Sequence, residues 1–243
     1  MTLFLSPTDI LALTLTFKLA LVTTLLLLII STPIAWFLSR WNSPWRALFE
    51  SLIALPLVLP PTVLGFYLLI FLAPDSFIGS SWYSLTGHQL AFSFSGLVIA
   101  SIIYSLPFVV QPLQLAFEKI DPTTLECAEV LGASSWRRFT SIVIPSTRNS
   151  FLLASVLGFA HTIGEFGVVL MIGGNIPGET QVLSLVLFDY VESLDYAAAH
   201  RLAATLVCFS VVMLVIVYSL NRGTLLRKKV SGKSPIINST WEA

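Results

Sequence analysis

The chain has 243 residues, of which 56% are hydrophobic and only 11% are charged, and its formal net charge at neutral pH is zero. Soluble domains carry about 25% charged residues, so this composition excludes an ordinary soluble domain, and the balanced charge argues against a nucleic-acid partner. The two cysteines, Cys127 and Cys208, imply neither a disulfide nor a metal site.

Five apolar blocks divide the chain, and each is long enough to cross a bilayer, which takes about 20 apolar residues. The pattern predicts an all-α, polytopic membrane protein with about five transmembrane helices. We expect a transmembrane domain over residues 8–221, a charged segment within it over residues 118–146, and a tail over residues 222–243. The blocks span approximately residues 10–38, 48–73, 91–117, 150–172 and 197–220.

Lysine and arginine positions predict how the chain is oriented. Eleven of the 13 basic residues fall in the first connection, the third connection and the tail, and only Lys18 and Arg201 lie inside blocks. Basic connections stay on the cytoplasmic side of a membrane, so we expect the N-terminus outside and the C-terminus in the cytoplasm. The second and fourth connections carry acidic residues instead of basic ones: Asp75, Glu179, Asp189, Glu192 and Asp195.

The segment over residues 118–146 is the longest charged interruption of the apolar sequence. Asp121 followed by Pro122 is typical of a helix start, and Gly132 suits the left-handed residue just past a helix end. Ser134 or Ser135 is expected to cap a second short helix. The sequence therefore predicts a bent pair of short helices between the third and fourth blocks.

This segment resembles the "EAA" signature of importer-type ATP-binding-cassette (ABC) permeases, which reads E-A-A, then G after three residues and I-x-L-P after nine more. Its spacing matches at Glu126, Cys127, Ala128, Gly132, Ile142, Ile144 and Pro145, with Cys127 in place of alanine and Ile144 in place of leucine. In that family the segment, called the coupling segment below, inserts into a groove on a separate ATPase subunit. The alternative is an amphipathic helix lying on the bilayer surface. The resemblance implies ATPase-coupling roles for Glu126, Cys127, Ala128, Glu129, Gly132, Ile142 and Pro145.

The second block contains Pro56, Pro60 and Pro61 near its middle. Proline removes a backbone donor and clashes with the preceding turn, so we expect this helix to break. The break would create a fresh helix N-terminus at Pro61 and Thr62, and helix N-termini attract anions. Pro60, Pro61 and Thr62 are therefore candidates for a translocation path or gate; the alternative is a packing kink that touches no substrate.

The fourth block contains the stretch HTIGEFG over residues 161–167. Acids inside a membrane are costly and usually mark function, so Gly164, Glu165 and Gly167 are candidates for the same path or gate. If the cargo is an oxyanion, a carboxylate would repel it, and we then expect Glu165 to bond neighbouring backbone or to pair with a basic residue. His161 is expected to be a hydrogen-bonded packing residue rather than a substrate ligand.

The fourth connection and the tail carry weaker signals. Turn-forming residues fill 173–180, a short outer helix is expected over 180–191, and this side is where a soluble substrate-binding protein would dock. The tail triplet at residues 232–234 reads Gly-Lys-Ser, but the first glycine of a nucleotide-binding P-loop is missing. We therefore expect no nucleotide site, no catalytic residue and no cofactor on this chain.

Three stretches, over residues 55–65, 126–139 and 164–180, resemble the molybdate permeases of bacteria. The resemblance implies a transport subunit, not an enzyme, in the bacterial inner membrane. Two copies would form a pore for molybdate or tungstate that works by alternating access, in contact with membrane lipid. Its partners would be two ATPase subunits that bind ATP and Mg²⁺ and a periplasmic oxyanion-binding protein. The alternatives are a sulfate or thiosulfate ABC permease, or an ion-gradient-driven transporter in which Glu165 and His161 carry protons.

Overall fold

In the computed structural model the backbone is described for residues 6–231 and the side chains for residues 6–215. These residues form helices joined by turns and loops, so the predicted all-α class is confirmed. Four helical stretches in this part of the chain are long and apolar enough to cross a membrane, and a fifth crossing results if the bent pair α2 and α3 counts as one. The chain divides into two compact units, Met1–Ala204 and Thr205–Ala243, and the boundary falls inside the last helix.

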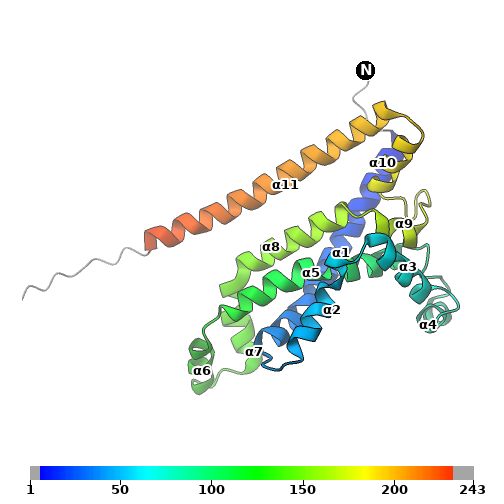
Figure 1. The fold of residues 1–243 in the computed structure, drawn as a ribbon. Coiled ribbons are helices and arrows are strands. Elements are labelled where there is room, and N and C mark those ends of the chain that lie inside the picture. The colour runs from blue at the N-terminus through cyan, green and yellow to red at the C-terminus, as the bar shows by residue number, and fades with distance from the viewer. Residues whose placement is uncertain (1–5, 232–243) are drawn as a thin grey trace, which may run out of the picture. The chain divides into compact units, whose positions relative to one another are not determined.

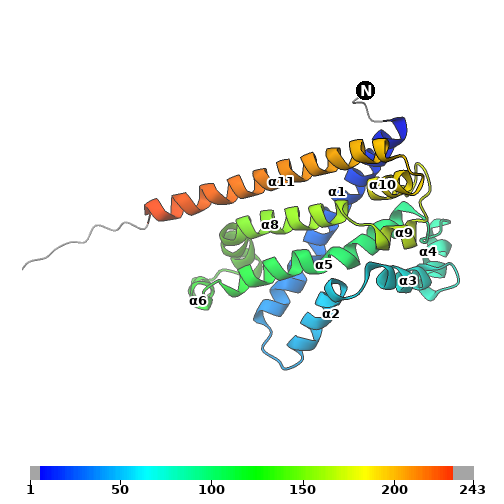
Figure 2. The same ribbon diagram turned by 45° about the horizontal axis from the view of Figure 1, so that its top comes forward.

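Three long helices form the frame of the first unit: α1 (Pro7–Arg40), α5 (Phe94–Glu118) and α8 (Ile144–Ile163). They pack against one another pairwise, and α5 and α8 run side by side in Figures 1 and 2. Ser6 begins α1 with a capping box, because its hydroxyl accepts from the Asp9 N–H while the Asp9 carboxylate accepts from the Ser6 N–H. Each of the three helices buries small and apolar side chains against the others, which fixes their spacing.

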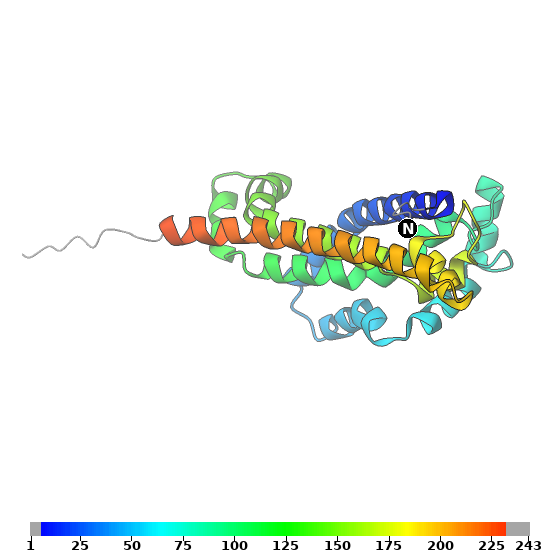
Figure 3. The same cartoon turned by 90° about the horizontal axis from the view of Figure 1, so that it is seen from above.

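The second apolar block is broken where its prolines predicted. Helix α2 (Arg46–Val58) and helix α3 (Pro61–Leu72) are separated by Leu59 and Pro60 and meet at an angle of 111°. Pro61 occupies the first turn of α3, where its missing N–H leaves no bond unmade. Seen from above, α2 and α1 lie on opposite sides of α5 (Figure 3).

The expectation that residues 150–172 form one span is wrong. Helix α8 ends at Ile163 and the short helix α9 (Gly167–Gly173) follows after a break at Gly164–Phe166. The helical rod also starts earlier than expected, because α7 (Ser135–Arg138) and the π-helical turn η1 (Phe139–Val143) lead directly into α8. Two glycines flanking a charged residue weaken a helix interior, and this signal accounts for the break.

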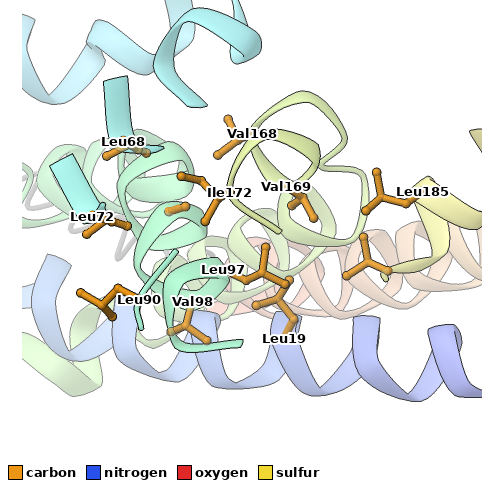
Figure 4. Packing of buried hydrophobic residues seen from close by; sticks show 12 residues of the cluster. Leu19, Leu68, Leu72, Leu90, Leu97, Val98, Val168, Val169, Ile172 and Leu185 are labelled. Atoms are coloured by element: carbon orange, nitrogen blue, oxygen red, sulfur yellow. The ribbon is translucent and has the colours of Figure 1, made fainter. Parts of the chain in front are cut away.

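Helix α9 packs beside α3, so the two broken blocks meet. Figure 4 shows the apolar core at this contact, with Leu68 and Leu72 of α3 facing Val168 and Ile172 of α9. The same core continues to α1, α5 and α10 through Leu19, Leu97, Val98 and Leu185.

The end of the first unit opposite the coupling segment carries α4 (Phe77–Thr86), α9 and α10 (Leu183–Glu192) (Figure 1). Helix α4 was not anticipated; Ser76 caps its start, and Gly87 ends it in the left-handed region. Helix α10 confirms the short helix expected near residues 180–191, although Leu183, Leu185 and Val186 are buried. It is tied to the start of the chain because the Tyr190 hydroxyl donates to Asp9 (2.9 Å).

The last helix, α11, spans Tyr196–Ser231 and so continues about three turns beyond the apolar block. The first ten residues of the predicted tail, 222–231, are therefore helical. The remainder of the tail, including the Gly-Lys-Ser triplet at residues 232–234, lies outside the described residues.

Candidate functional site

The coupling segment contains two short helices of the expected kind. Helix α6 (Pro122–Val130) starts at Asp121, whose carboxylate accepts from the Thr123 N–H (2.9 Å), and no residue in it is buried. Gly132 ends it with φ +83°, and the Ala133 N–H reaches back to the Ala128 carbonyl (3.0 Å). Ser134, one of the two predicted caps, begins α7 by accepting from the Arg137 N–H (3.3 Å).

An ion pair fixes the bend between these helices. The Arg138 guanidinium contacts the Glu129 carboxylate at 2.5 Å and also donates to the Ser135 hydroxyl (3.1 Å). Glu129, one of the predicted coupling residues, is thus bound within its own segment. Because its side chain is largely exposed, this pair orients the two helices and contributes little to overall stability.

The tip of the coupling segment exposes apolar side chains to its surroundings. Val130 is 88% exposed and Leu131 is 86% exposed, and Trp136 on α7 is 75% exposed. Among the predicted coupling residues, Glu126 and Cys127 are also exposed, Ala128 is half-buried, and Gly132 has open space where a side chain would start. Sequence reasoning missed Val130 and Leu131, because they lie between the signature positions and match none of the signature letters.

The base of the coupling segment is fixed to the rest of the chain by aromatic rings. Trp36 of α1 contacts Phe117 and Phe139 edge-on, with ring centroids 5.5 and 5.4 Å apart, and Phe151 of α8 joins the same cluster. Arg40 lies over the Trp36 ring and donates to the last turn of α5 at the Phe117 carbonyl (3.3 Å). Edge-to-face aromatic packing is directional, so this cluster fixes the base of the segment relative to α1, α5 and α8.

The last two predicted coupling residues lie within this fixed base. Ile142 is half-buried in η1, and Pro145 is exposed in the first turn of α8. Neither belongs to the exposed tip; both lie where the coupling segment joins the helical bundle. π-helical turns are uncommon and recur at functional sites.

A second region of interest is a cavity of about 530 Å³ at the point where both broken helices meet, called the junction cavity below. Of the six residues predicted for a path or gate, five line it: Pro61, Thr62, Gly164, Glu165 and Gly167. Pro60 is the N-cap residue of α3 and directly precedes them. Two residues not predicted for the path, Tyr104 and His161, line the same cavity.

Glycines allow the close approach of the two breaks. A Cβ placed on Gly167 would lie 2.9 Å from the Pro61 Cβ, and one on Gly65 would lie 2.8 Å from the Met171 Cβ. Real Cβ atoms essentially never come that close to a neighbour. The contact between α3 and α9 therefore requires glycine at both positions, and the junction cavity depends on that contact.

The carboxyl group of Glu165 does not face open space. Its side chain is fully buried, and its two carboxylate oxygens accept from the hydroxyls of Ser101 (2.5 Å) and Ser105 (2.9 Å) on α5. The sequence-based expectation named backbone groups or a basic residue as its partner, whereas serine hydroxyls fill that role. The backbone carbonyl of Glu165 also accepts from Ser184 on α10 (2.5 Å), so this residue joins α5, the α8–α9 break and α10.

At the end near the coupling segment a polar cluster ties α2 to α5. The Arg46 guanidinium donates to Glu50 (2.7 Å) and pairs with Glu118, the last residue of α5. The Gln114 amide donates to both acids, at 2.5 and 3.2 Å. These residues and Gln111 line a cavity of about 570 Å³. Because α6 starts shortly after Glu118, the cluster connects the broken second block to the root of the coupling segment.

No group of three or more histidine, cysteine, aspartate or glutamate side chains placed to hold a metal ion occurs among the described residues. Ser101, Ser105 and Gln114 of α5 instead hydrogen-bond to acidic side chains of other elements, as polar side chains do in other membrane bundles.

The comparisons with known proteins assign the class of this helical bundle. Residues 31–227 match the family described as "Binding-protein-dependent transport system inner membrane component". The match covers most of the chain, and the protein belongs to this family. It is thus a multi-pass inner-membrane component of a transport system.

Several relatives of this chain are named for the substance that their transport system carries. The chain is 52% identical over 218 residues to the molybdenum transport system permease protein ModB of Azotobacter vinelandii, covering 90% of this chain and 96% of that one. It is 36% identical over 183 residues to the Escherichia coli K12 protein of the same name, covering 75% and 80% of the two chains. The sulfate transport system permease protein CysT of Escherichia coli K12 is 34% identical over 180 residues, covering 74% and 65%.

Solved structures show the same fold. Two crystal structures of a bacterial ABC transporter that imports alginate, one of them in complex with a pentasaccharide-bound periplasmic protein, match with TM-scores of 0.66 and 0.69. Each match covers 90% of this chain and about four-fifths of the other chain, at 20% identity. This likeness establishes the ABC importer permease fold, which the coupling segment had predicted.

Proposed function

We propose that this chain is the membrane permease subunit of an ABC importer for molybdate, driven by a separate ATPase that docks on the coupling segment. The observation that carries the proposal is the exposed tip at Val130 and Leu131, rigidly based on the aromatic cluster of Trp36 and Phe117. An exposed apolar tip on a fixed base suits a part that seats in another protein and transmits its motion.

The cargo assignment is supported by the relatives. A permease named for molybdenum transport shares 52% identity over almost its whole length, whereas the sulfate permease shares 34% over a shorter stretch. Molybdate and tungstate are both tetrahedral dianions of closely similar size, and either is a suitable cargo. The sulfate permease assignment remains the second candidate because that relative matches through most of this chain.

Two copies of this chain, two ATPase subunits and a periplasmic oxyanion-binding protein would complete the importer. ATP binding would draw the ATPases together and carry the coupling segments with them. The Arg46 cluster between α2 and α5 and the aromatic base would pass this motion to the junction cavity. This chain would perform no bond chemistry, and Mg²⁺ and ATP would be bound by the partner.

The proposed topology places the coupling segment in the cytoplasm and the N-terminus outside. It is supported by the gathering of the first and third connections at one end of the first unit, where Arg46 meets Glu118. The acidic connections gather at the other end, where Asp189 accepts from Asn175 (3.0 Å) and Gln181 (3.1 Å). Within this topology we assign residues 8–221 to the transmembrane domain, 118–146 to the coupling segment and 222–243 to a cytoplasmic tail.

Transport assays test the proposal. The chain is co-expressed with an ABC ATPase and a periplasmic oxyanion-binding protein from the same source and reconstituted in proteoliposomes, and molybdate uptake is measured with ATP inside or outside. We expect uptake that requires ATP on the side of the coupling segment and is unchanged by a proton uncoupler at constant ATP. Uptake that collapses with the proton gradient while ATP is held constant would contradict the proposal and favour an ion-driven transporter.

Cysteine labelling tests the topology separately. Cys127 is exposed in the coupling segment, so with Cys208→Ser as background a membrane-impermeant maleimide should label it only in inverted vesicles. The matched variant, Cys127→Ser with Glu179→Cys in the same background, should be labelled only in cells with permeabilised outer membranes. The opposite pattern would reverse the assignment of the two sides.

A further inference from the structure

Three polar groups of residues that line the junction cavity have no hydrogen-bond partner among the described side chains and backbone groups. Within the described residues no hydrogen bond involves the hydroxyl of Thr62, the hydroxyl of Tyr104 or the Nε2 atom of His161, although all three side chains line the cavity. Groups able to donate hydrogen bonds, left unpartnered around one cavity, are suited to a ligand that is rich in acceptors. A tetrahedral oxyanion has four acceptor oxygens.

The His161 ring is held in one orientation. It stacks on Phe108 with ring centroids 3.9 Å apart and lies 4.7 Å from the Tyr104 ring. Its Nδ1 atom lies 2.9 Å from the Ser105 hydroxyl oxygen. With this nitrogen committed to α5, Nε2 is the ring atom left to meet a ligand in the cavity.

Ser105 connects His161 to Glu165. The serine oxygen lies 2.9 Å from Glu165 Oε1 as well as 2.9 Å from His161 Nδ1. The neighbouring Thr162 hydroxyl donates to the Gly158 carbonyl (2.9 Å), so Thr162 does not supply a proton to this chain of bonds. The Ser105 oxygen also lies 3.3 Å from the Thr162 hydroxyl oxygen. A serine hydroxyl has a single proton, so at any moment Ser105 donates to one of three acceptors: Glu165, His161 or Thr162.

From this geometry we propose that Glu165, through Ser105, sets which tautomer His161 presents to a tetrahedral oxyanion in the junction cavity. When Glu165 is ionised, Ser105 donates to it, Nδ1–H donates to Ser105, and Nε2 presents a lone pair that repels the oxyanion. When Glu165 is protonated, it donates to Ser105, Ser105 donates to Nδ1, and Nε2–H becomes a donor to the oxyanion. The inference rests on the proposed function, because it assigns the cargo's contact within the same chain.

The two states differ by one proton. It enters from cavity water at Nε2, the Nδ1 proton passes to the Ser105 oxygen, and the Ser105 proton passes to Glu165 Oε1. The His161 ring and the Ser105 oxygen each gain one proton and give one up, and Glu165 gains one. The reverse sequence releases the oxyanion. The proton returns to the same cavity, so the device needs no proton gradient across the membrane.

The surroundings of Glu165 leave this relay as its main connection. Ser101 and Ser105 of α5 face its carboxylate, and Ser184 of α10 faces its carbonyl. His161 is the ionisable group within ion-pair distance, with Nδ1 3.7 Å from Oε1, and Tyr104 shares the cavity. Helix α9 contains no ionisable residue, and the polar residue with which α3 lines the cavity is Thr62. Lys18 of α1 is directed to the Phe94 ring, with its Nζ atom 4.5 Å from the ring centroid.

Nitrogen NMR of histidine tests the proposal directly. The chain carries three histidines, His88, His161 and His200, so ¹⁵N-histidine labelling of the permease in its nanodisc-reconstituted importer gives a small set of imidazole signals. His161→Phe, which keeps the stacking on Phe108, assigns the relevant signal. We expect sodium molybdate to convert His161 to the Nε2–H form without moving the other two signals, and sodium chloride to leave all three unchanged.

Variants separate the relay from ordinary packing. Ser105→Ala should abolish the tautomer response and weaken molybdate binding about tenfold, the usual cost of one bond to a charged ligand, and Ser105→Thr should restore both. Glu165→Gln should show the Nε2–H form without molybdate, because the amide donates to Ser105 as the protonated acid does. Its molybdate affinity should stay within about threefold of the wild-type value, whereas its uptake should slow because the oxyanion is no longer released by the switch.

Two results would overturn the proposal: a His161 signal that molybdate does not move, or a tautomer that Ser105→Ala leaves unchanged. Neither result depends on uptake. A wild-type importer that takes up molybdate with ATP but shows no His161 response retains the proposed function and loses this site. A wild-type importer that shows the response but no ATP-driven uptake retains the site and loses the proposed function.

Discussion

The coupling segment and the junction cavity are built in opposite ways. Helix α6 and its turn are stabilised by neighbours in sequence: Asp121 caps its own helix, Gly132 ends it, and Glu129 pairs with Arg138 nine residues on. At the junction cavity, by contrast, partners such as Glu165 and Ser101 are 64 residues apart. The outward-facing part is thus locally determined, whereas the internal part depends on several helices packing at once.

This difference predicts how each region fails. A change at the exposed tip of the coupling segment should weaken docking of the proposed ATPase and leave the fold intact, because Val130 and Leu131 are almost fully exposed. A change at the junction should disturb packing first and transport as a consequence. The following variants sharpen the contrast, beginning with the largest expected effect.

Leu131→Arg should cause the largest loss. Leu131 is 86% exposed on the coupling segment, and a charge at the centre of a docked interface typically costs about 2 kcal/mol or more, roughly thirtyfold in affinity. Co-purification of the ATPase measures it. The matched control is Leu85→Arg, because Leu85 is 84% exposed on α4 at the other end. If both variants retain equal amounts of ATPase, the tip of the coupling segment is not the docking surface.

Gly167→Ala should destabilise the fold by about 1–3 kcal/mol, the cost of forcing a methyl group into a packed contact. The added Cβ would lie 2.9 Å from the Pro61 Cβ. Gly164→Ala is the control, since the atoms nearest to its Cβ would be the Ala160 and His161 carbonyl oxygens, both 3.7 Å away. The two thermal unfolding midpoints in nanodiscs give the comparison; a Gly164 variant as unstable as the Gly167 variant would contradict the packing explanation.

Arg46→Gln should weaken the tie between α2 and α5 by about 1 kcal/mol, because the pair is only partly shielded from solvent. We expect more ATP hydrolysed per molybdate transported, since the coupling segment would move with less effect on the broken helix. The exchange Arg46→Glu with Glu118→Arg should recover part of the ratio. If the double variant transports no more molybdate per ATP than the single variants do, Arg46 acts without Glu118.

Glu129→Gln should have the smallest effect, a change in stability below about 0.5 kcal/mol, because its side chain is 63% exposed. Thermal unfolding of the permease alone should therefore match the wild type. If the bend that the ion pair orients matters for docking, ATPase affinity falls while stability does not. A large loss of stability would show that this region is not held by its caps alone.

The sequence by itself determined the features that rest on local chemistry. Apolar block length set the number of crossings, the prolines at 56, 60 and 61 set the break between α2 and α3, and Asp121, Gly132 and Ser134 set the coupling segment. These signals act within a few residues, where capping, proline geometry and periodicity decide conformation.

Only the tertiary structure decided how the two breaks meet and what Glu165 contacts. The fourth block is long enough to read as one span despite its internal Glu165, and only the structure shows that its break at residues 164–166 places Gly167 against Pro61. Serine in a membrane helix is commonplace, so nothing marked Ser101 and Ser105 as the partners of a buried acid. Hydrogen bonds between distant helices follow from packing, which a single sequence does not display because its signals are local.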